Sequence, residues 1–278
     1  MIAAYTMYAT EKQKPAIRAF WTAMAARCRD AGMAVPARLS WNMAEEDQWR
    51  APNLVLAQAC GYPMMKGVTG PVRIIATPSY AAPFCEGTSY CSVVVVGKDS
   101  PVTSMAQLRG QRAAVNKPTS HSGYNALRRL VADYAHQAED ADIPDLAGGL
   151  RFFSTVKETG RHRDSLMAVA KGKADVAAID AVSFHFLGQA EPALTGAVRI
   201  LTTTMPAPGL PLVTAHWRPD EEVAILRNAL ADVLGDRKLR EALEAMAITG
   251  FGVLGRGHYE RVLEMEREAQ SLHYPVLQ

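Results

Sequence analysis

Five consecutive residues between an apolar segment and a helical pattern carry the groups best suited to chemistry: Thr119, Ser120, His121, Ser122 and Gly123. They follow the strand-like sequence RAAVN and precede a helical pattern that begins at Tyr124. The first N–H groups of a helix have no partner within the helix, and the helix dipole places partial positive charge there. Hydroxyl groups at such a start favour a site for a phosphate-like oxyanion.

Two other roles fit the same residues. One hydroxyl of the three could cap the helix, and capping does not exclude anion binding. Ser122, His162 and Asp180 could also form the triad of a serine hydrolase. The sequence has neither a GxSxG elbow around Ser122 nor the phosphate-binding pattern GxxxxGKS/T. Oxyanion donation therefore explains the turn better than catalysis does.

The elements that must position these residues alternate between short apolar runs and helical patterns. Strands are predicted at residues 2–8, 53–59, 72–77, 92–97, 112–116, 150–154, 176–180, 198–203 and 212–215. Helices are predicted at residues 16–31, 104–108, 124–136, 163–171, 181–187, 220–234, 236–247 and 257–269. Near-continuous apolar strands between helices predict an α/β fold with mostly parallel sheets.

The middle third of the chain forms a β-α-β-α series of its own. The chain leaves the first part near residues 93–98 and returns near residues 201–205, both in extended segments. We therefore expect two lobes, residues 1–94 plus 203–278 and residues 95–202, joined by a two-strand hinge around a ligand cleft.

Composition excludes some functions and leaves others open. The 278 residues carry a net charge of +2 without a basic stripe, which argues against a nucleic-acid partner. No run approaches the roughly 18 apolar residues of a membrane span, so no membrane insertion is expected. The four cysteines show no zinc-ligand spacing, and a disulfide between Cys60 and Cys85 stays open. The N-terminus lacks a secretory signal, so the protein is cytoplasmic if Met1 is the native start and exported if a leader has been removed or replaced.

Ordered segments along nearly the whole chain resemble the phosphonate-binding proteins of ABC transporters. The longest is SYCSVVVVGKDSPVTSMAQLRGQRAAVNKPTSHSGYNALRRL, which contains the DSP segment, the LRG turn and the Ser-rich turn. TGRHRDSLMAVAKGKADVAAIDAVSF, RILTTTMPAPGLPLVT, IAAYTMY and LVLAQACGYP resemble further parts of the family pattern.

The resemblance implies a two-lobed type II periplasmic-binding-protein fold that holds a small phosphorus oxyanion between its lobes. The ligand would be a phosphonate, a phosphite or a phosphate ester, and the partner an ABC permease. A monomer without cofactor or metal would suffice. The residues carried over from the family pattern are Tyr8, Tyr62 and Tyr90 in the first lobe and Thr119, Ser120, Ser122, Gly123, His162 and Asp180 in the second.

Two departures from the family pattern concern individual residues. His121 stands where a small residue is expected, and it either adds a donor to the ligand or points to solvent. The acidic residue expected near His162 for an aminoalkyl group is missing, although Glu158 is close in sequence.

Several of these residues could have purely structural roles. Each tyrosine could be a half-buried core residue, His162 a loop residue, and Asp180 the cap of the helix that follows it. At the level of function, the alternative is a sensory or cytoplasmic protein of the same fold that binds another small anion. The substituent on the oxyanion is not encoded in any recognisable pattern.

Overall fold

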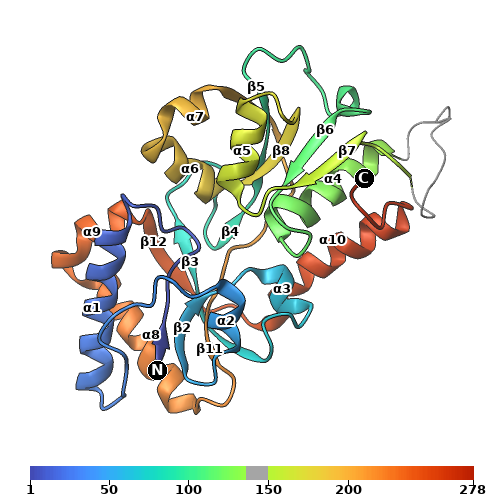
Figure 1. Cartoon of the computed structure of the whole chain (residues 1–278). Coiled ribbons are helices and arrows are strands. Elements are labelled where there is room, and N and C mark those ends of the chain that lie inside the picture. Colours follow the sequence, from blue (N-terminus) through green and yellow to red (C-terminus); the bar gives the residue numbers. More distant parts are fainter. Residues whose placement is uncertain (136–149) are drawn as a thin grey trace. The chain divides into compact units, whose positions relative to one another are not determined.

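The chain folds into two compact units in a computed structural model that describes residues 1–135 and 150–278 (Figure 1). The first unit contains Met1–Ser89 and Pro208–Tyr259, and the second contains Tyr90–Ala207 and Glu260–Gln278. The chain therefore passes between the units three times. The expected division placed residues 203–278 wholly in the first lobe, whereas residues 260–278 lie in the second unit.

The first unit is built on a five-stranded sheet in the order β1-β2-β11-β3-β12. Its strands are β1 (Ile2–Ala3), β2 (Leu54–Gln58), β3 (Val72–Tyr80), β11 (Leu212–Ala215) and β12 (Ile248–Gly252). β1 pairs with β2 in parallel, and β11 pairs antiparallel with both β2 and β3. β1, β2 and β3 consequently run in the same direction, and their carboxyl ends share one edge of the sheet.

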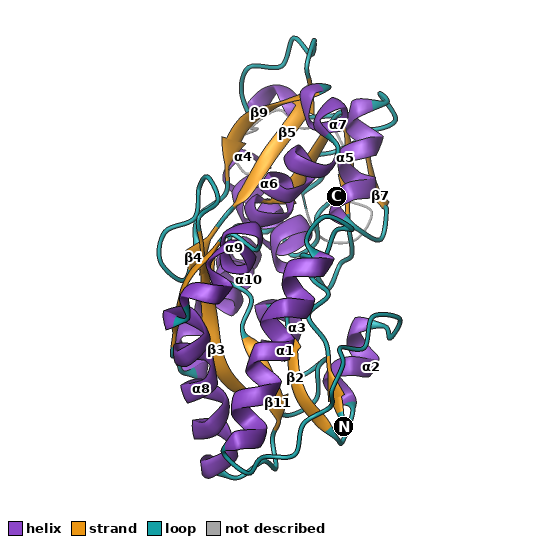
Figure 2. Cartoon of the chain, turned by 90° about the vertical axis from the view of Figure 1, so that its left-hand side faces the viewer, coloured by secondary structure: helices purple, strands orange, loops and turns teal. Residues whose placement is uncertain are grey.

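Amphipathic helices cover this sheet. They are α1 (Lys14–Asp30), α2 (Glu45–Arg50), α3 (Gly61–Met65), α8 (Asp220–Gly235) and α9 (Arg240–Ala245), with short 3-10 turns at Arg237–Leu239 and Arg256–Tyr259. α1 buries Ile17, Phe20, Trp21, Met24 and Cys28, whose spacing places them on one helix face. α1 packs against α8 and α9, and α8 lies on β3 and β12 (Figure 2).

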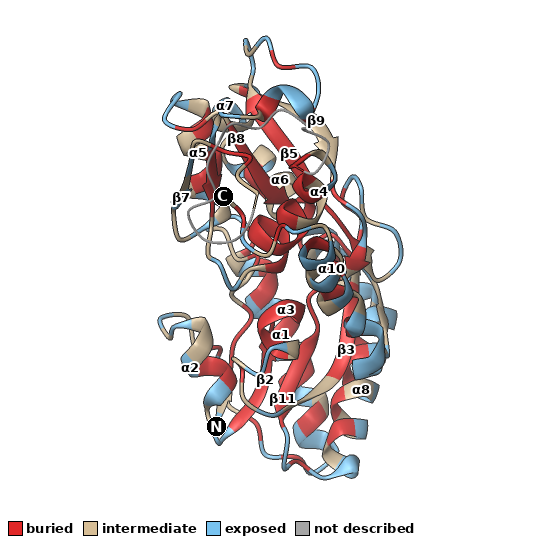
Figure 3. Ribbon diagram, turned by 90° about the vertical axis from the view of Figure 1, so that its right-hand side faces the viewer, coloured by how far each residue is buried: buried red, intermediate tan, exposed pale blue. Residues whose placement is uncertain are grey.

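The second unit is built on a sheet in the order β7-β6-β8-β5-β9. Its strands are β5 (Ser92–Gly97), β6 (Arg112–Val115), β7 (Thr155–Glu158), β8 (Val176–Asp180) and β9 (Val198–Thr203). Alternate residues of β5 belong to two different cores, one with Val94 and Val96 and the other with Val93 and Val95. Because both faces are covered, the strands read as nearly continuous apolar runs, and β8 and all of β5 except Gly97 are buried (Figure 3).

Helices cover both faces of this second sheet. They are the 3-10 turn η1 (Ala106–Leu108), the π-helical turn η2 (His121–Asn125), α4 (Ala126–Ala135), α5 (His162–Ala170), α6 (Ala181–Ala190), α7 (Pro192–Gly196) and α10 (Glu260–Ser271). The core around α4 includes Ala269, Tyr274 and Leu277 from the end of the chain. The backbone N–H groups of Phe152 and Phe153 both donate to the carbonyl of Gln278, at 2.7 and 3.0 Å. These contacts explain why the C-terminal residues belong to the second unit.

Two of the three connections between the units are extended. β4 (Ser89–Tyr90) and β10 (Ala207–Pro208) pair in a separate two-stranded sheet. The third connection is the peptide bond between Tyr259 and Glu260, just before α10. The expected hinge of two strands therefore has a third connection beside it.

Several other expectations differ from the structure. Both main sheets are mixed rather than mostly parallel, because β5, β9, β11 and β12 run antiparallel to their neighbours. Residues 150–154 are irregular, and the strand begins at Thr155. β3 continues through Pro78, which was expected to end it. β11 pairs with β3 only as far as Ala76, so one side of Pro78 is a sheet edge, where proline is tolerated.

Many predicted bounds agree within a few residues, as for α1, β5, β8 and β9. The predicted helix 124–136 ends at His136, which lies outside the described residues. None of the described helices is long and apolar enough to cross a membrane.

We expect Tyr274→Ala to destabilise the second unit by about 3–5 kcal/mol, because it empties a fully buried aromatic site. Val276→Ala is the matched control, since Val276 lies in the same segment but is 48% exposed. Denaturant unfolding followed by circular dichroism measures both changes. Equal stability of the two variants would contradict the assignment of this segment to the core.

Candidate functional site

The Ser-rich turn begins with a capped π-helical turn. The Ser120 hydroxyl accepts a hydrogen bond from the Gly123 N–H at 3.2 Å, and the Asn125 N–H donates to the Ser120 carbonyl at 3.1 Å. The second bond spans five residues, which widens the first turn relative to an α-helix. No described group accepts a hydrogen bond from the backbone N–H of His121 or Ser122. Capping thus occupies one hydroxyl and one N–H, and leaves two N–H groups at the helix start.

The Asn116 side chain, directly after β6, connects this turn to His162. Its Nδ2 donates to Ser120 Oγ at 3.0 Å and lies 3.3 Å from His162 Nε2, while its Oδ1 accepts from the Lys117 N–H at 2.9 Å. Ser122 Oγ lies 2.9 Å from the same His162 nitrogen. The structure therefore brings the two serines and His162, three of the sequence-predicted residues, into one cluster.

Gly123 is required by a close approach within this cluster. A Cβ atom at position 123 would lie 2.0 Å from Asn116 Oδ1, far inside van der Waals contact. The backbone of Gly123 itself has an ordinary negative φ, so crowding rather than backbone strain excludes a side chain.

The cluster lies where parallel strands of the second sheet end. β6 and β8 are parallel, and the chain continues from their ends into the Ser-rich turn and into α6. Asp180 ends β8 and caps α6 by accepting the Ser183 N–H at 2.9 Å. Ser92 pairs with Asp180 across the sheet, and its hydroxyl donates to the Ser122 carbonyl at 2.8 Å. This edge is where ligands bind in open α/β sheets, and the helix starts there favour an anion.

Tyr90 and His121 form a buried pair beside the cluster. Tyr90 was expected in the first lobe. It is instead the first residue of the second unit. The His121 ring lies 6.2 Å from the Tyr90 ring, and its Nδ1 lies 3.2 Å from Asn125 Nδ2. His121 is 2% exposed, so of the two roles left open for it, the one in which it points to solvent is excluded.

Thr119 and Glu158 lie at the periphery. Thr119 is exposed at the outer side of the turn, and no hydrogen bond of its hydroxyl is recorded among the described residues. Glu158 ends β7 and is also exposed. Neither side chain is brought to Ser122 and His162 by a recorded bond.

Burial keeps both histidines uncharged at neutral pH. Burial lowers the pKa of His162 to about 4, and the backbone at Ala178 opposes this shift only in part. Burial lowers the pKa of His121 to about 3, and the charge of Arg261 lowers it further. His162 therefore offers the site a neutral imidazole, and its Nε2 accepts hydrogen bonds because it faces the Asn116 Nδ2 group.

The first unit gathers tyrosines at the carboxyl edge of its own parallel strands. Tyr8 is 6% exposed, and its ring meets that of Tyr80 edge to face at 5.3 Å. The Tyr80 hydroxyl lies 2.8 Å from the Tyr5 hydroxyl and accepts from Gln58 Nε2 at 2.9 Å. Tyr62 is also 6% exposed, lies on α3, and has the Lys66 ammonium 6.0 Å from its ring centre.

Sequence reasoning missed four polar residues of these two edges: Gln58, Tyr80, Ser92 and Asn116. Three of them stand at an end of a short apolar run, which is a readable signal for a sheet edge. Tyr80 could not be found in this way, because the strand was expected to end before Pro78.

The four cysteines are present as thiols, so the bridge considered between Cys60 and Cys85 is not formed in this structure. Burial, with the nearby Asp180 carboxylate, raises the pKa of Cys91 to about 11. Within residues 1–135 and 150–278, no three side chains of metal-ligating type are grouped closely enough to hold an ion.

Two α/β units, paired crossing strands and an anion-suited helix start define a class: solute-binding proteins of the type II periplasmic-binding fold. Residues 5–259 match the family of the ABC transporter, phosphonate, periplasmic substrate-binding protein, and the chain belongs to this family. The family serves ABC importers in the periplasm. No curated protein matches the chain.

Solved structures agree on the fold. A binding-protein component of an ABC phosphonate transporter from Pseudomonas aeruginosa superposes with a TM-score of 0.75 at 17% identity, over 98% of this chain and 87% of that one. PhnD1 from Prochlorococcus marinus, in complex with methylphosphonate, superposes with a TM-score of 0.72 at 13% identity. The match covers 97% of this chain and 98% of that one. XAC2383 from Xanthomonas citri, bound to ATP, superposes with a TM-score of 0.68 at 19% identity. The match covers 98% of this chain and 97% of that one.

We expect Gly123→Ala to lower both stability and ligand affinity, since its Cβ must displace the Asn116 amide. The loss of stability should be about 1–3 kcal/mol, typical of overpacking. Gly188→Ala in α6 is the control, because its Cβ would meet its nearest neighbour, Thr195 Oγ1, at an ordinary 3.8 Å. Thermal unfolding and calorimetric titration measure the two effects. A Gly123→Ala protein as stable as the Gly188→Ala protein would contradict the close approach.

The lowered pKa of His162 predicts a pH-dependent stability. Its folded pKa of about 4 lies below the ordinary 6.5, so the unfolded chain binds the proton first. The neutral ring therefore favours the folded state above pH 6.5, and this advantage is lost as pH falls from 6.5 to about 4. His162→Gln should flatten the dependence of the unfolding free energy on pH in this window. If the unfolding free energies of the parent and the variant changed with pH in parallel, His162 would not be the cause of the pH dependence.

Proposed function

We propose that this protein captures a small phosphorus oxyanion, as a phosphonate, a phosphite or a phosphate ester, for an ABC transporter. Membership of the phosphonate-binding family supports the ligand class. The observation that carries the proposal is the cluster of Ser120, Ser122, Asn116 and His162 at a helix start. It offers hydroxyl, amide and imidazole groups together with the backbone N–H groups of the turn.

The chemistry of the cluster suits an anion held by neutral donors. The N–H groups of His121 and Ser122 belong to buried residues and point from the positive end of the helix, where an anion would compensate them. Asn116 Nδ2 makes His162 Nε2 an acceptor, so Ser122 donates to this nitrogen and can turn the same proton to a ligand in exchange for that bond. An oxyanion in this place would accept from both kinds of donor, and each charge-assisted bond is stronger than a neutral one.

The proposal treats the cluster as a binding site and not as a hydrolase triad. Ser122 and His162 are within hydrogen-bond distance, as a nucleophile and its base would be. The Asp180 carboxylate, however, accepts the Ser183 N–H at the start of α6, which is a capping role. An activated ester such as p-nitrophenyl acetate tests the alternative, since a burst of nitrophenol would support catalysis.

The remaining assignments are part of the same proposal. Tyr8 and Tyr62 in the first unit and Tyr90, Thr119, Gly123 and Asp180 in the second are candidate ligand contacts from the family pattern, and His121, which departs from that pattern, is a further candidate. We propose a periplasmic monomer that delivers its ligand to an ABC permease. A cytoplasmic sensor of the same fold would bind the ligand without such a partner.

Calorimetric titration with phosphate, phosphite, methylphosphonate, 2-aminoethylphosphonate and sulfate tests the proposed ligand class. We expect one phosphorus compound to bind at least tenfold more tightly than sulfate. With that ligand, Ser120→Ala and Ser122→Ala should each weaken binding by about 1–3 kcal/mol, because the first removes the half-buried hydroxyl that caps the turn and the second removes a buried hydroxyl.

Thr119→Ala is the matched comparison for these variants, since it removes an exposed hydroxyl of the same turn. It should change the affinity less than either serine variant does. Unchanged affinity in both serine variants, with the fold intact, would refute the role of the turn. Preferred binding of sulfate would refute the ligand class.

A further inference from the structure

The last residue of the π-helical turn, Asn125, is fully buried and lies one turn away from the proposed ligand contacts. We propose that Asn125 is the positioning residue of the oxyanion-binding turn, and that it holds this turn against the start of α10. The inference rests on the proposed function of the turn. Asn125 itself is not offered as a ligand contact.

The side-chain amide of Asn125 bonds in two directions. Its Nδ2 donates to the Val262 carbonyl on α10 at 2.8 Å, and its Oδ1 accepts from Arg128 Nη2 at 2.6 Å. A carbonyl can only accept and a guanidinium can only donate, so the amide has one possible orientation. Its backbone N–H meanwhile closes the five-residue bond to Ser120.

This fixed orientation also determines the state of His121. Asn125 Nδ2 faces His121 Nδ1 at 3.2 Å, so that this ring nitrogen must accept and the ring must be neutral. Protonation would set two N–H groups against each other in a buried place. The pKa of His121, lowered to about 3 by burial, agrees with this arrangement. His121 and Asn125 thus brace the turn as one unit.

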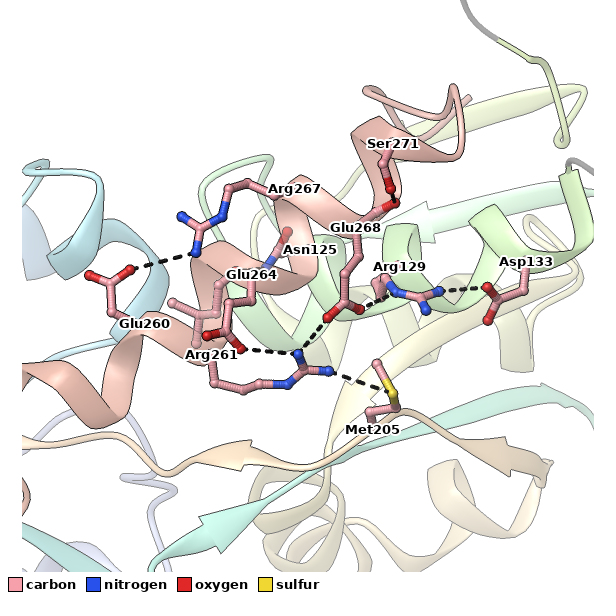
Figure 4. A network of polar contacts seen from close by, with 11 residues as sticks. Asn125, Arg129, Asp133, Met205, Glu260, Arg261, Glu264, Arg267, Glu268 and Ser271 are labelled. Atoms are coloured by element: carbon pink, nitrogen blue, oxygen red, sulfur yellow. Dashed lines mark hydrogen bonds and ion pairs between the residues drawn. The ribbon is translucent and has the colours of Figure 1, made fainter.

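α10 packs against α4, and an ion pair between the two helices is accompanied by further pairs within each helix (Figure 4). Arg129 bonds to Glu268 on α10 at 2.5 Å and to Asp133 on α4 at 2.7 Å. Arg261 pairs with Glu264 and Glu268 on α10 itself, at 3.2 and 2.6 Å. Such partly exposed pairs contribute little individually, so the buried Asn125 bonds are the specific link to the turn.

The consequence of losing this link is local. Without the Asn125 side chain, Val262 keeps a buried carbonyl without this donor, and the widened turn loses its attachment to α10. Ser120 and Ser122 would then be free to shift relative to Asn116 and His162, whose strand and helix are held independently. Affinity would fall through misplaced donors even where the unit remains folded.

The experiment compares Asn125→Ala and Asn125→Asp with Val96→Ala. The aspartate keeps an acceptor for Arg128 but loses the donor to Val262 and His121. Val96 is buried in the same unit, on β5, so its truncation destabilises the unit without removing a bond of the turn. Amide hydrogen exchange over residues 119–127 and calorimetric titration with methylphosphonate and with phosphite are the two measurements.

At matched global stability, we expect the amides of residues 119–127 to exchange about tenfold faster in both Asn125 variants than in Val96→Ala. We also expect both Asn125 variants to bind methylphosphonate or phosphite about tenfold more weakly than Val96→Ala does. Exchange equal to that of Val96→Ala, or unchanged affinity, would overturn the positioning role. If the parent protein binds neither compound, methylphosphonate and phosphite are excluded as its ligands, while the exchange data still decide the role of Asn125.

Discussion

The second unit is organised around the crowded side-chain amide of Asn116. This amide ends β6, contacts Ser120 and His162, and lies so close to position 123 that no side chain fits there. It thereby sets the distance between the Ser-rich turn and the start of α5. The positions of Ser122 and of the neutral His162 ring follow from that distance, and so does the spacing of the proposed donors.

Neutral groups dominate this site because burial decides the charge state of its titratable members. Burial lowers the pKa of both histidines, so they are neutral at pH 7. The Asp180 carboxylate, at the end of the neighbouring strand, accepts a backbone N–H at a helix start. In the proposed site, the attraction for an anion would therefore come from oriented dipoles and hydroxyls. Such groups cost little to preorganise and need no opposing full charge in the interior.

Local patterns in the sequence were sufficient for part of this arrangement. Successive residues of β5 and β8 pack into cores on opposite faces of the sheet, so these strands are apolar runs that could be predicted. The TSHSG turn is typical of a helix start, so this start could also be predicted. The π-helical turn, the insertion of β11 between β2 and β3, and the packing of α10 on α4 depend on contacts between distant residues. Gln58 and Asn116 were readable as polar strand ends, but only the fold shows what they contact.

The interleaved topology has a consequence for biosynthesis. The sheet of the first unit lacks its central strand until Leu212–Ala215 has been made, and the core of the second unit lacks Tyr274 and Leu277 until these residues have been made. Each unit therefore depends on a segment that is made late, residues 208–259 for the first unit and residues 260–278 for the second. Contacts between segments so distant in the sequence carry a large loop-closure cost, so neither unit is expected to fold as fast as a domain built from local contacts.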